Sequence, residues 1–140
     1  MKITVIHGPN LNLLGQRDVQ QYGPLQLKDI QDLLVHQFPS IDFEFYQSNI
    51  EGEIIDMIQR CIRDNQPLII NPGGYSHTSV AMRDALEILQ APKIEVHLSN
   101  IHSREEFRHQ SLTGSVCNGI IMGLKENGYP LAVQAILQLL

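Results

Sequence analysis

A glutamate and a histidine two residues apart could carry acid–base chemistry in this sequence. Glu95 and His97 lie in the run EVHLS, ahead of a segment crowded with titratable groups, SNIHSREEFRH (99–109). Alternate residues of a strand share one face, so the Glu95 carboxylate can fix the tautomer of the His97 ring and raise its basicity. A histidine held in this way can act as a general acid near neutral pH. For the pair taken alone, a structural or surface histidine is the alternative.

A second polar segment, NPGGYSHTS (71–79), joins an expected strand to an expected helix. Its glycines allow close backbone approach, and Ser76, Thr78 or Ser79 could cap the helix, whose first N–H groups favour an anion. Asn71 and His77 could then bind hydroxyl or carboxylate oxygens. The alternative is an ordinary turn with a capped helix. No lysine follows the glycines, so the segment is not a phosphate loop.

The segment PNLNLLGQRDVQQYG (9–23) has no clear periodicity. Loops of this length inside compact domains are usually functional, and we expect an active-site lid at about 9–24. A guanidinium such as that of Arg17 would stabilise the phenolate of Tyr22, so that the pair could remove a proton from carbon. A tyrosine that only packs the loop onto the body of the protein is the alternative.

Arg104 and Arg108 are four residues apart and would share one face if SREEFRHQ is helical. They could bind an anionic or polyhydroxylated substrate. They could equally pair with surface carboxylates such as Glu105, as most helical Arg–Glu runs do.

Short β-rich runs alternate with amphipathic helical runs along the chain and would position these side chains. Apolar spacing predicts strands over 2–7, 41–48, 67–71, 93–99 and 117–123, and helices over 25–38, 51–65, 77–89 and 130–140. This alternation predicts an α/β fold, a single domain over 1–140 with a flavodoxin-like, doubly wound parallel sheet of order 2-1-3-4-5 and helices on both faces. Ligands of such sheets bind beyond the carboxyl ends of the strands, where the polar segments fall.

Composition and charge narrow the class of protein. The chain has 140 residues, of which 43% are hydrophobic, and a net charge of −5, which argues against electrostatically driven binding of nucleic acid. Cys61 and Cys117 lie in apolar patterns, which predicts buried free thiols and a reducing compartment. No apolar run approaches the roughly 20 residues of a membrane-spanning helix, and the N-terminal run is too short for a signal peptide. We therefore expect a cytoplasmic protein with no membrane partner.

Four motifs together resemble the type II 3-dehydroquinate dehydratases, from Ile3 to Ile136. They are HGPNLNLLGQRDVQQYG, QSNIEGEIID, NPGGYSHTSVAMRDAL and IEVHLSNIHSREEFR, in that order. The resemblance implies a flavodoxin-like fold, a dodecamer of four trimers, no metal or cofactor, and a hydro-lyase of the shikimate pathway. Such an enzyme converts 3-dehydroquinate into 3-dehydroshikimate by anti elimination of water through an enolate.

The resemblance also implies a role for individual residues. Tyr22 looks like the base that removes the C2 proton, Arg17 resembles the lid arginine that keeps it ionised, and Arg104 resembles a second arginine nearby. Asn10 looks like the holder of a water that stabilises the enolate. His97 is similar to the acid that protonates the departing C1 hydroxyl, with Glu95 as its orienting partner.

The remaining matches concern substrate binding. Asn71 and the backbone N–H groups of Leu98 and Ser99 match the carboxylate and hydroxyl site, and His77 and Arg108 match contacts to the ring hydroxyls. Asp84 is also assigned to substrate. His7, where many members have asparagine, is expected behind the residues that touch substrate.

Three other functions remain as alternatives. A flavodoxin-like flavin or nucleotide carrier would need a phosphate-binding loop after the first strand, and HGPNLNLLG is a poor one. A receiver-type signalling domain would need clustered aspartates at strand ends, whereas the first strand ends in His7-Gly8. A metal hydrolase could use His97, His102 and His109.

Overall fold

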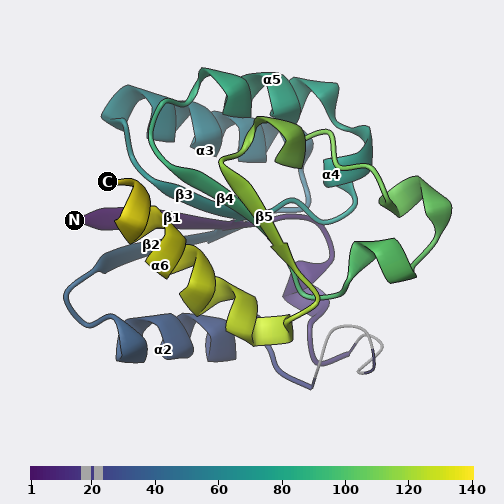
Figure 1. Ribbon diagram of the computed structural model, residues 1–140, viewed down its shortest axis with the longest axis horizontal. Helices are drawn as coiled ribbons and strands as arrows, with labels where there is room; N and C mark the ends of the chain where they lie inside the picture. Colours follow the sequence, from purple (N-terminus) through teal and green to yellow (C-terminus); the bar gives the residue numbers. More distant parts are fainter. Residues whose placement is uncertain (17–19, 21–23) are drawn as a thin grey trace.

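A five-stranded parallel sheet forms the centre of the molecule (Figure 1). The computed structural model describes residues 1–16, 20 and 24–140. The strands are β1 (Lys2–His7), β2 (Asp42–Gln47), β3 (Leu68–Asn71), β4 (Lys93–His97) and β5 (Gly119–Met122), and their order in the sheet is β2-β1-β3-β4-β5. This order confirms the predicted doubly wound α/β sheet. The strand that follows β1 in the sequence, β2, lies on one side of it, and all later strands lie on the other. The point between β1 and β3 where the strand order reverses is where such sheets bind ligands.

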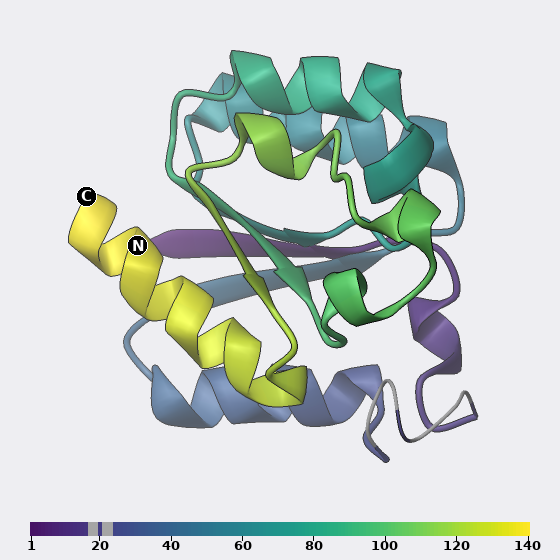
Figure 2. The ribbon, with the colours of Figure 1, turned by 45° about the vertical axis from the view of Figure 1, so that its right-hand side comes forward.

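Helices cover both faces of the sheet (Figures 1 and 2). The α-helices of the described residues are α2 (Leu27–Gln37), α3 (Glu51–Asp64), α4 (Tyr75–Thr78), α5 (Val80–Ile88) and α6 (Gly128–Leu139). Ile3 and Val5 of β1 pack with α2 and α6, whereas Ile6 packs with α3 and α5. A strand that is buried on both faces needs an almost unbroken apolar run, and KITVIH provides one.

The third predicted helix, 77–89, differs from the observed structure. Helical structure begins at Tyr75 as the single turn α4 and resumes at Val80 as α5. Ser79 separates the two with an extended backbone (φ −93°, ψ 94°), and its Oγ accepts a hydrogen bond of 3.0 Å from Met82 N. Of the three candidate caps, Ser79 therefore caps α5.

The segment after β4 is built from turns rather than from one helix. It contains the 3₁₀ turns η2 (Ile101–Ser103), η3 (Glu106–Arg108) and η4 (Gly114–Val116). The helical interpretation of SREEFRHQ is therefore wrong, because Arg104 follows η2 and Arg108 ends η3. β4 also ends at His97, so the backbone N–H groups of Leu98 and Ser99 lie beyond the strand.

The ends of β1 and β3 are pressed tightly together. His7 and Asn71 are register partners across these two strands. Gly8 follows β1 with its N–H bonded to the Asn71 carbonyl at 2.8 Å, and a Cβ at Gly8 would overlap the carbonyl oxygen of Pro72. Only glycine fits this approach.

Among the described helices, none is long and apolar enough to cross a membrane.

Candidate active site

A cavity of about 140 Å³ opens beyond the carboxyl ends of β1, β3 and β4. It is lined by Pro9, Asn10, Leu11, Asn71, Gly73, Gly74, His77, His97, Leu98, Ser99, Ile101, Arg104 and Arg108. Eight of the side chains and backbone groups predicted from the sequence to touch substrate or to act on it therefore share one cavity. The lining is mostly amide, imidazole, hydroxyl and guanidinium, which suits a small polar ligand rather than an apolar one.

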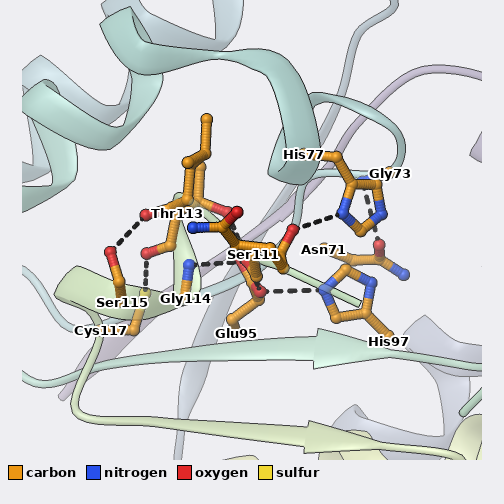
Figure 3. A network of polar contacts seen from close by, with 12 residues as sticks. Asn71, Gly73, His77, Glu95, His97, Ser111, Thr113, Gly114, Ser115 and Cys117 are labelled. Carbon is orange, nitrogen blue, oxygen red and sulfur yellow. Dashed lines mark hydrogen bonds and ion pairs between the residues drawn. The ribbon is translucent and has the colours of Figure 1, made fainter. Parts of the chain in front are cut away.

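Glu95 and His97 form a buried pair (Figure 3), of which His97 lines the cavity. Glu95 Oε2 lies 2.9 Å from His97 Nε2, with Glu95 0% and His97 6% exposed. The two residues sit on the same face of β4, as the spacing in the sequence predicts. An ionised carboxylate only accepts, so Nε2 carries the hydrogen and Nδ1 is the ring nitrogen left for a ligand.

Two hydroxyl groups also hold Glu95, and the sequence analysis missed both. Ser111 Oγ donates to Glu95 Oε2 at 2.6 Å, and Thr113 Oγ1 donates to Glu95 Oε1. Both residues come from the segment between η3 and η4, which Figure 3 shows lying against the Glu95 carboxylate. The only available signal was a cluster of hydroxyl residues in HQSLTGS (109–115).

Asn71 is oriented by a second buried chain of hydrogen bonds. Its Oδ1 accepts from Gly73 N at 3.2 Å, and its Nδ2 donates to Tyr129 Oη at 3.3 Å. Tyr129 Oη lies 3.0 Å from His7 Nε2. Because Nδ2 can only donate, the tyrosine hydroxyl accepts from Asn71 and turns its own hydrogen toward His7. His7 thus lies behind Asn71, as expected.

Burial sets the protonation states of His7 and Tyr129 in this series of hydrogen bonds. It lowers the pKa of His7 to about 4, so the ring is neutral at pH 7 and its Nε2 can accept. Burial also raises the pKa of the Tyr129 phenol, which stays a donor, and the hydrogen bond from Asn71 opposes this only in part. The amide of Asn71 therefore has one fixed orientation, with the second hydrogen of Nδ2 left for a ligand.

His77 lies beside His97, and both residues line the cavity (Figure 3). The two rings are stacked with their centroids 6.4 Å apart, and His77 Nδ1 lies 2.9 Å from the carbonyl oxygen of Gln110. Burial lowers the pKa of His77, and the Gln110 bond opposes this in part. Nδ1 donates to the carbonyl, so the neutral ring offers Nε2 to a ligand.

Arg104 and Arg108 bring positive charge to the cavity. Arg108 Nε donates to Glu105, and its guanidinium carbon lies 4.9 Å from the ring centroid of Phe107. These two contacts restrain the Arg108 side chain. Guanidinium groups are suited to bind carboxylates and hydroxyls in a defined geometry.

Comparison with known proteins identifies the family. A model of the family described as "Dehydroquinase class II" matches residues 1–137. The chain belongs to the class II dehydroquinases. This class II dehydroquinase chain is 53% identical to the 3-dehydroquinate dehydratase of a Sulfurovum species over 100% of its own length and 88% of the relative's. It is 49% identical to that of Wolinella succinogenes, over 100% and 86% of the two chains.

A solved structure agrees with the same family. The type II dehydroquinase from Butyrivibrio crossotus superimposes on this class II dehydroquinase with a TM-score of 0.94 and 46% identity, over 98% of this chain and 97% of that one. The predicted family and fold are thus confirmed, and the flavin-carrier alternative is not favoured.

The remaining predicted residues of this class II dehydroquinase are not all brought to the cavity. Asn10 lines it with a left-handed backbone (φ 70°), and its N–H donates to Asn49 Oδ1 at 2.9 Å. Asp84 instead lies exposed on α5, paired with Arg83 at 2.9 Å, and does not line the cavity. Arg17 and Tyr22 lie outside the described residues, as does most of the predicted lid beyond residue 16.

The three histidines of the metal-hydrolase alternative are not gathered into one site. The rings of His102 and His109 lie 5.6 Å apart, whereas His97 is bonded to Glu95. In the described part of this class II dehydroquinase, no three His, Cys, Asp or Glu side chains are grouped so that they could hold a metal ion.

Proposed function

We propose that this chain is a type II 3-dehydroquinate dehydratase, which removes water from 3-dehydroquinate to give 3-dehydroshikimate. The family match over residues 1–137 and the names of its relatives support this activity. The observation that carries it in the structure is the buried Glu95–His97 pair, whose histidine lines a polar cavity. A cyclic hydroxy acid needs an acid for its departing hydroxyl, and this pair provides one.

His97 is the general acid of the proposed reaction. Its ring donates Nε2–H to Glu95 and keeps Nδ1 for the hydroxyl that leaves C1. The buried negative charge of Glu95 stabilises the imidazolium before the proton is delivered. When the C1–O bond breaks, the proton of His97 leaves with the hydroxyl as water.

Tyr22 is the proposed base, on the strength of the family resemblance. Its phenolate removes the C2 proton, and Arg17 and Arg104 stabilise the phenolate electrostatically. The electron pair of the C2–H bond moves into an enolate, whose oxygen is stabilised by a water held by Asn10. Collapse of the enolate expels the C1 hydroxyl and leaves the conjugated enone.

Substrate binding is assigned to other groups that line the same cavity. Asn71 and the backbone N–H groups of Leu98 and Ser99 bind the carboxylate and a hydroxyl. His77 and Arg108 contact the ring hydroxyls. Asp84 does not take part in this arrangement within the chain, because it lies on α5 outside the cavity lining.

We also propose an assembly of four trimers and a cytoplasmic enzyme of the shikimate pathway, both implied by the family resemblance. Exposed apolar side chains on the outer helices, among them Val80, Ile88 and Leu137, offer surface for subunit contacts. The free thiols Cys61 and Cys117 suit a reducing compartment. Analytical ultracentrifugation of the purified protein tests the dodecamer.

Product formation is the direct test of the proposed function. Purified protein is mixed with 3-dehydroquinate in EDTA, and the ultraviolet absorbance of the enone product is followed. His97→Ala should lower turnover by about 10²–10⁴-fold, the usual contribution of a general acid. His36→Ala, an exposed histidine on α2, is the control and should keep wild-type turnover.

The result that overturns the proposal is a folded protein that forms no enone. A visible flavin spectrum from that same preparation would support the carrier alternative instead. Equal turnover of His97→Ala and His36→Ala would leave the dehydratase in place but remove His97 as its acid.

A further inference from the structure

The Glu95 carboxylate is fully buried and bonded through both oxygens. Oε2 accepts from His97 Nε2 at 2.9 Å and from Ser111 Oγ at 2.6 Å, while Oε1 accepts from Thr113 Oγ1 (Figure 3). A buried carboxylate with no partners is very costly, so such groups persist only when donors surround them. The acid pair of β4 thus depends on residues from a separate segment of the chain.

The direction of the Ser111 hydroxyl is fixed by its neighbours. The backbone N–H of Gly114 donates to Ser111 Oγ at 2.9 Å. This N–H cannot accept, so the serine uses a lone pair for it and turns its own hydrogen toward Glu95. Thr113 Oγ1 lies 3.3 Å from the same Oγ, but Glu95 Oε2 at 2.6 Å is the nearer acceptor and carries the negative charge, so the serine donates to the carboxylate.

Thr113 bonds to the other oxygen of the carboxylate and is held there mainly by burial. Its side chain is completely buried, and its carbonyl oxygen accepts the Cys117 thiol at 3.4 Å. Burial, reinforced by the negative charge of Glu95, raises the pKa of that thiol to about 12, so the thiol stays protonated and keeps donating. The threonine hydroxyl is thus anchored against Glu95 Oε1.

Gly114 allows the segment to come this close. A Cβ at this position would overlap Cδ1 of Ile120 and would stand 2.7 Å from Glu95 Oε2. Both hydroxyls can reach the carboxylate because the backbone beside them carries no side chain.

From this geometry we infer that Ser111 and Thr113 are positioning residues for the acid: they lock the Glu95 carboxylate in the plane that holds His97 toward the substrate. The inference rests on the proposed function. Because three donors bond to the two oxygens of Glu95, the carboxylate is held against rotation about its Cγ–Cδ bond. Without the hydroxyls the carboxylate can turn away, and the imidazole then loses the partner that fixes its tautomer and orientation.

The variants Ser111→Ala and Thr113→Val remove one hydroxyl each with little change of volume. Each should lower kcat for elimination by about tenfold, a part of the general-acid contribution, and should change KM less than about twofold. Proton removal at C2 does not use His97, so exchange of the C2 proton with deuterated solvent should rise relative to product formation. A fault in packing alone would lower both rates together.

A second readout asks whether the hydroxyls act through His97. In a His97→Ala background, Ser111→Ala and Thr113→Val should change the residual elimination rate less than about twofold, because the group that they position is gone. The conservative variants Ser111→Thr and Thr113→Ser keep a hydroxyl and should recover most of the lost turnover.

Ser115→Ala is the matched control. Ser115 lies two residues beyond Thr113, in η4, but is exposed, and its Oγ donates to the Leu112 carbonyl at 2.6 Å instead of to Glu95. It should keep wild-type turnover. Wild-type kcat in folded Ser111→Ala and Thr113→Val, or equal losses with and without His97, would overturn the inference while leaving the dehydratase intact. Absence of turnover in the wild type would refute the proposed function itself.

Discussion

Asn71 Nδ2 lies 3.3 Å from the hydroxyl of Tyr129, a residue on α6 at the far end of the sequence. The same hydroxyl lies 3.0 Å from His7, the register partner of Asn71 on β1. Three elements that are distant in the sequence thus meet under one substrate-binding amide. The orientation of that amide depends on a tyrosine that never reaches the cavity lining.

Tyr129→Phe should weaken substrate binding more than it slows the chemical step. Removing the hydroxyl leaves Asn71 Nδ2 and His7 Nε2 without this partner, at a cost of about 1–3 kcal/mol for each buried group left unpaired. We expect KM to rise severalfold with a smaller change in kcat, together with a lower free energy of unfolding. Steady-state kinetics and denaturant unfolding measure the two effects. Tyr46→Phe, on the edge strand β2, is the control, and an equal KM in both variants would contradict the prediction.

The stability of the protein should depend on pH through His7. Its pKa is about 4 in the native state and 6.5 without burial, so the unfolded chain binds more protons between these values. The contribution of His7 is complete above pH 6.5 and is lost as the pH falls toward 4. At about 1.4 kcal/mol per pH unit, the loss is about 3 kcal/mol over this range.

Denaturant unfolding between pH 4 and pH 7 tests this contribution. The titration of other groups cancels in the difference between wild type and His7→Gln, because both proteins share them. The free energy of unfolding should fall less steeply with decreasing pH in the variant. Parallel curves for the two proteins would show that His7 is not the titrating group.

Gly114→Ala should damage both stability and turnover, for separable reasons. The added methyl group overlaps Ile120 Cδ1 and presses on Glu95 Oε2. Adding Ile120→Val removes Cδ1 and should restore part of the thermal stability, whereas kcat should stay low because the pressure on Glu95 remains. Gly52→Ala on α3 is the control, since a Cβ there meets no atom within 4 Å. Full recovery of kcat in the double variant would contradict this explanation.

Turnover should survive both a metal chelator and borohydride added with substrate. The proposed elimination needs only proton transfers, and no lysine is found among the described residues that line the cavity. A Schiff-base route would require one. Mass spectrometry of the borohydride-treated protein should show the unmodified chain mass, and a trapped covalent adduct would refute the enolate route.

The sequence predicted those parts of the fold and site that depend on local periodicity. Continuous apolar runs identified β1 and β3, and the two-residue spacing of Glu95 and His97 predicted their contact. The ends of parallel strands then placed Asn71 near His97, because they share one edge of the sheet. These conclusions needed only the geometry of a strand and of a parallel sheet.

Contacts between distant segments could not be predicted in this way. Ser111 and Thr113 reach Glu95 through consecutive turns that have no periodic pattern. Tyr129 was missed because the closing helix was expected to begin at Pro130, as prolines favour the first turn, whereas α6 starts at Gly128. In each case tertiary packing, rather than a local pattern, determines which polar groups meet.

The hydrogen bonds of Glu95 hold the two ends of the loop 98–110 together. The chain enters the loop from His97 and leaves it at Ser111, and both residues bond to the same oxygen of Glu95. Arg104 and Arg108 lie within the loop, whereas the acid, His97, stands at its entry, and all three line the cavity. The two ends of the loop and the arginines between them are therefore separable: sequence changes between residues 100 and 108 can alter the guanidinium groups while the hydrogen bonds that hold the acid stay in place.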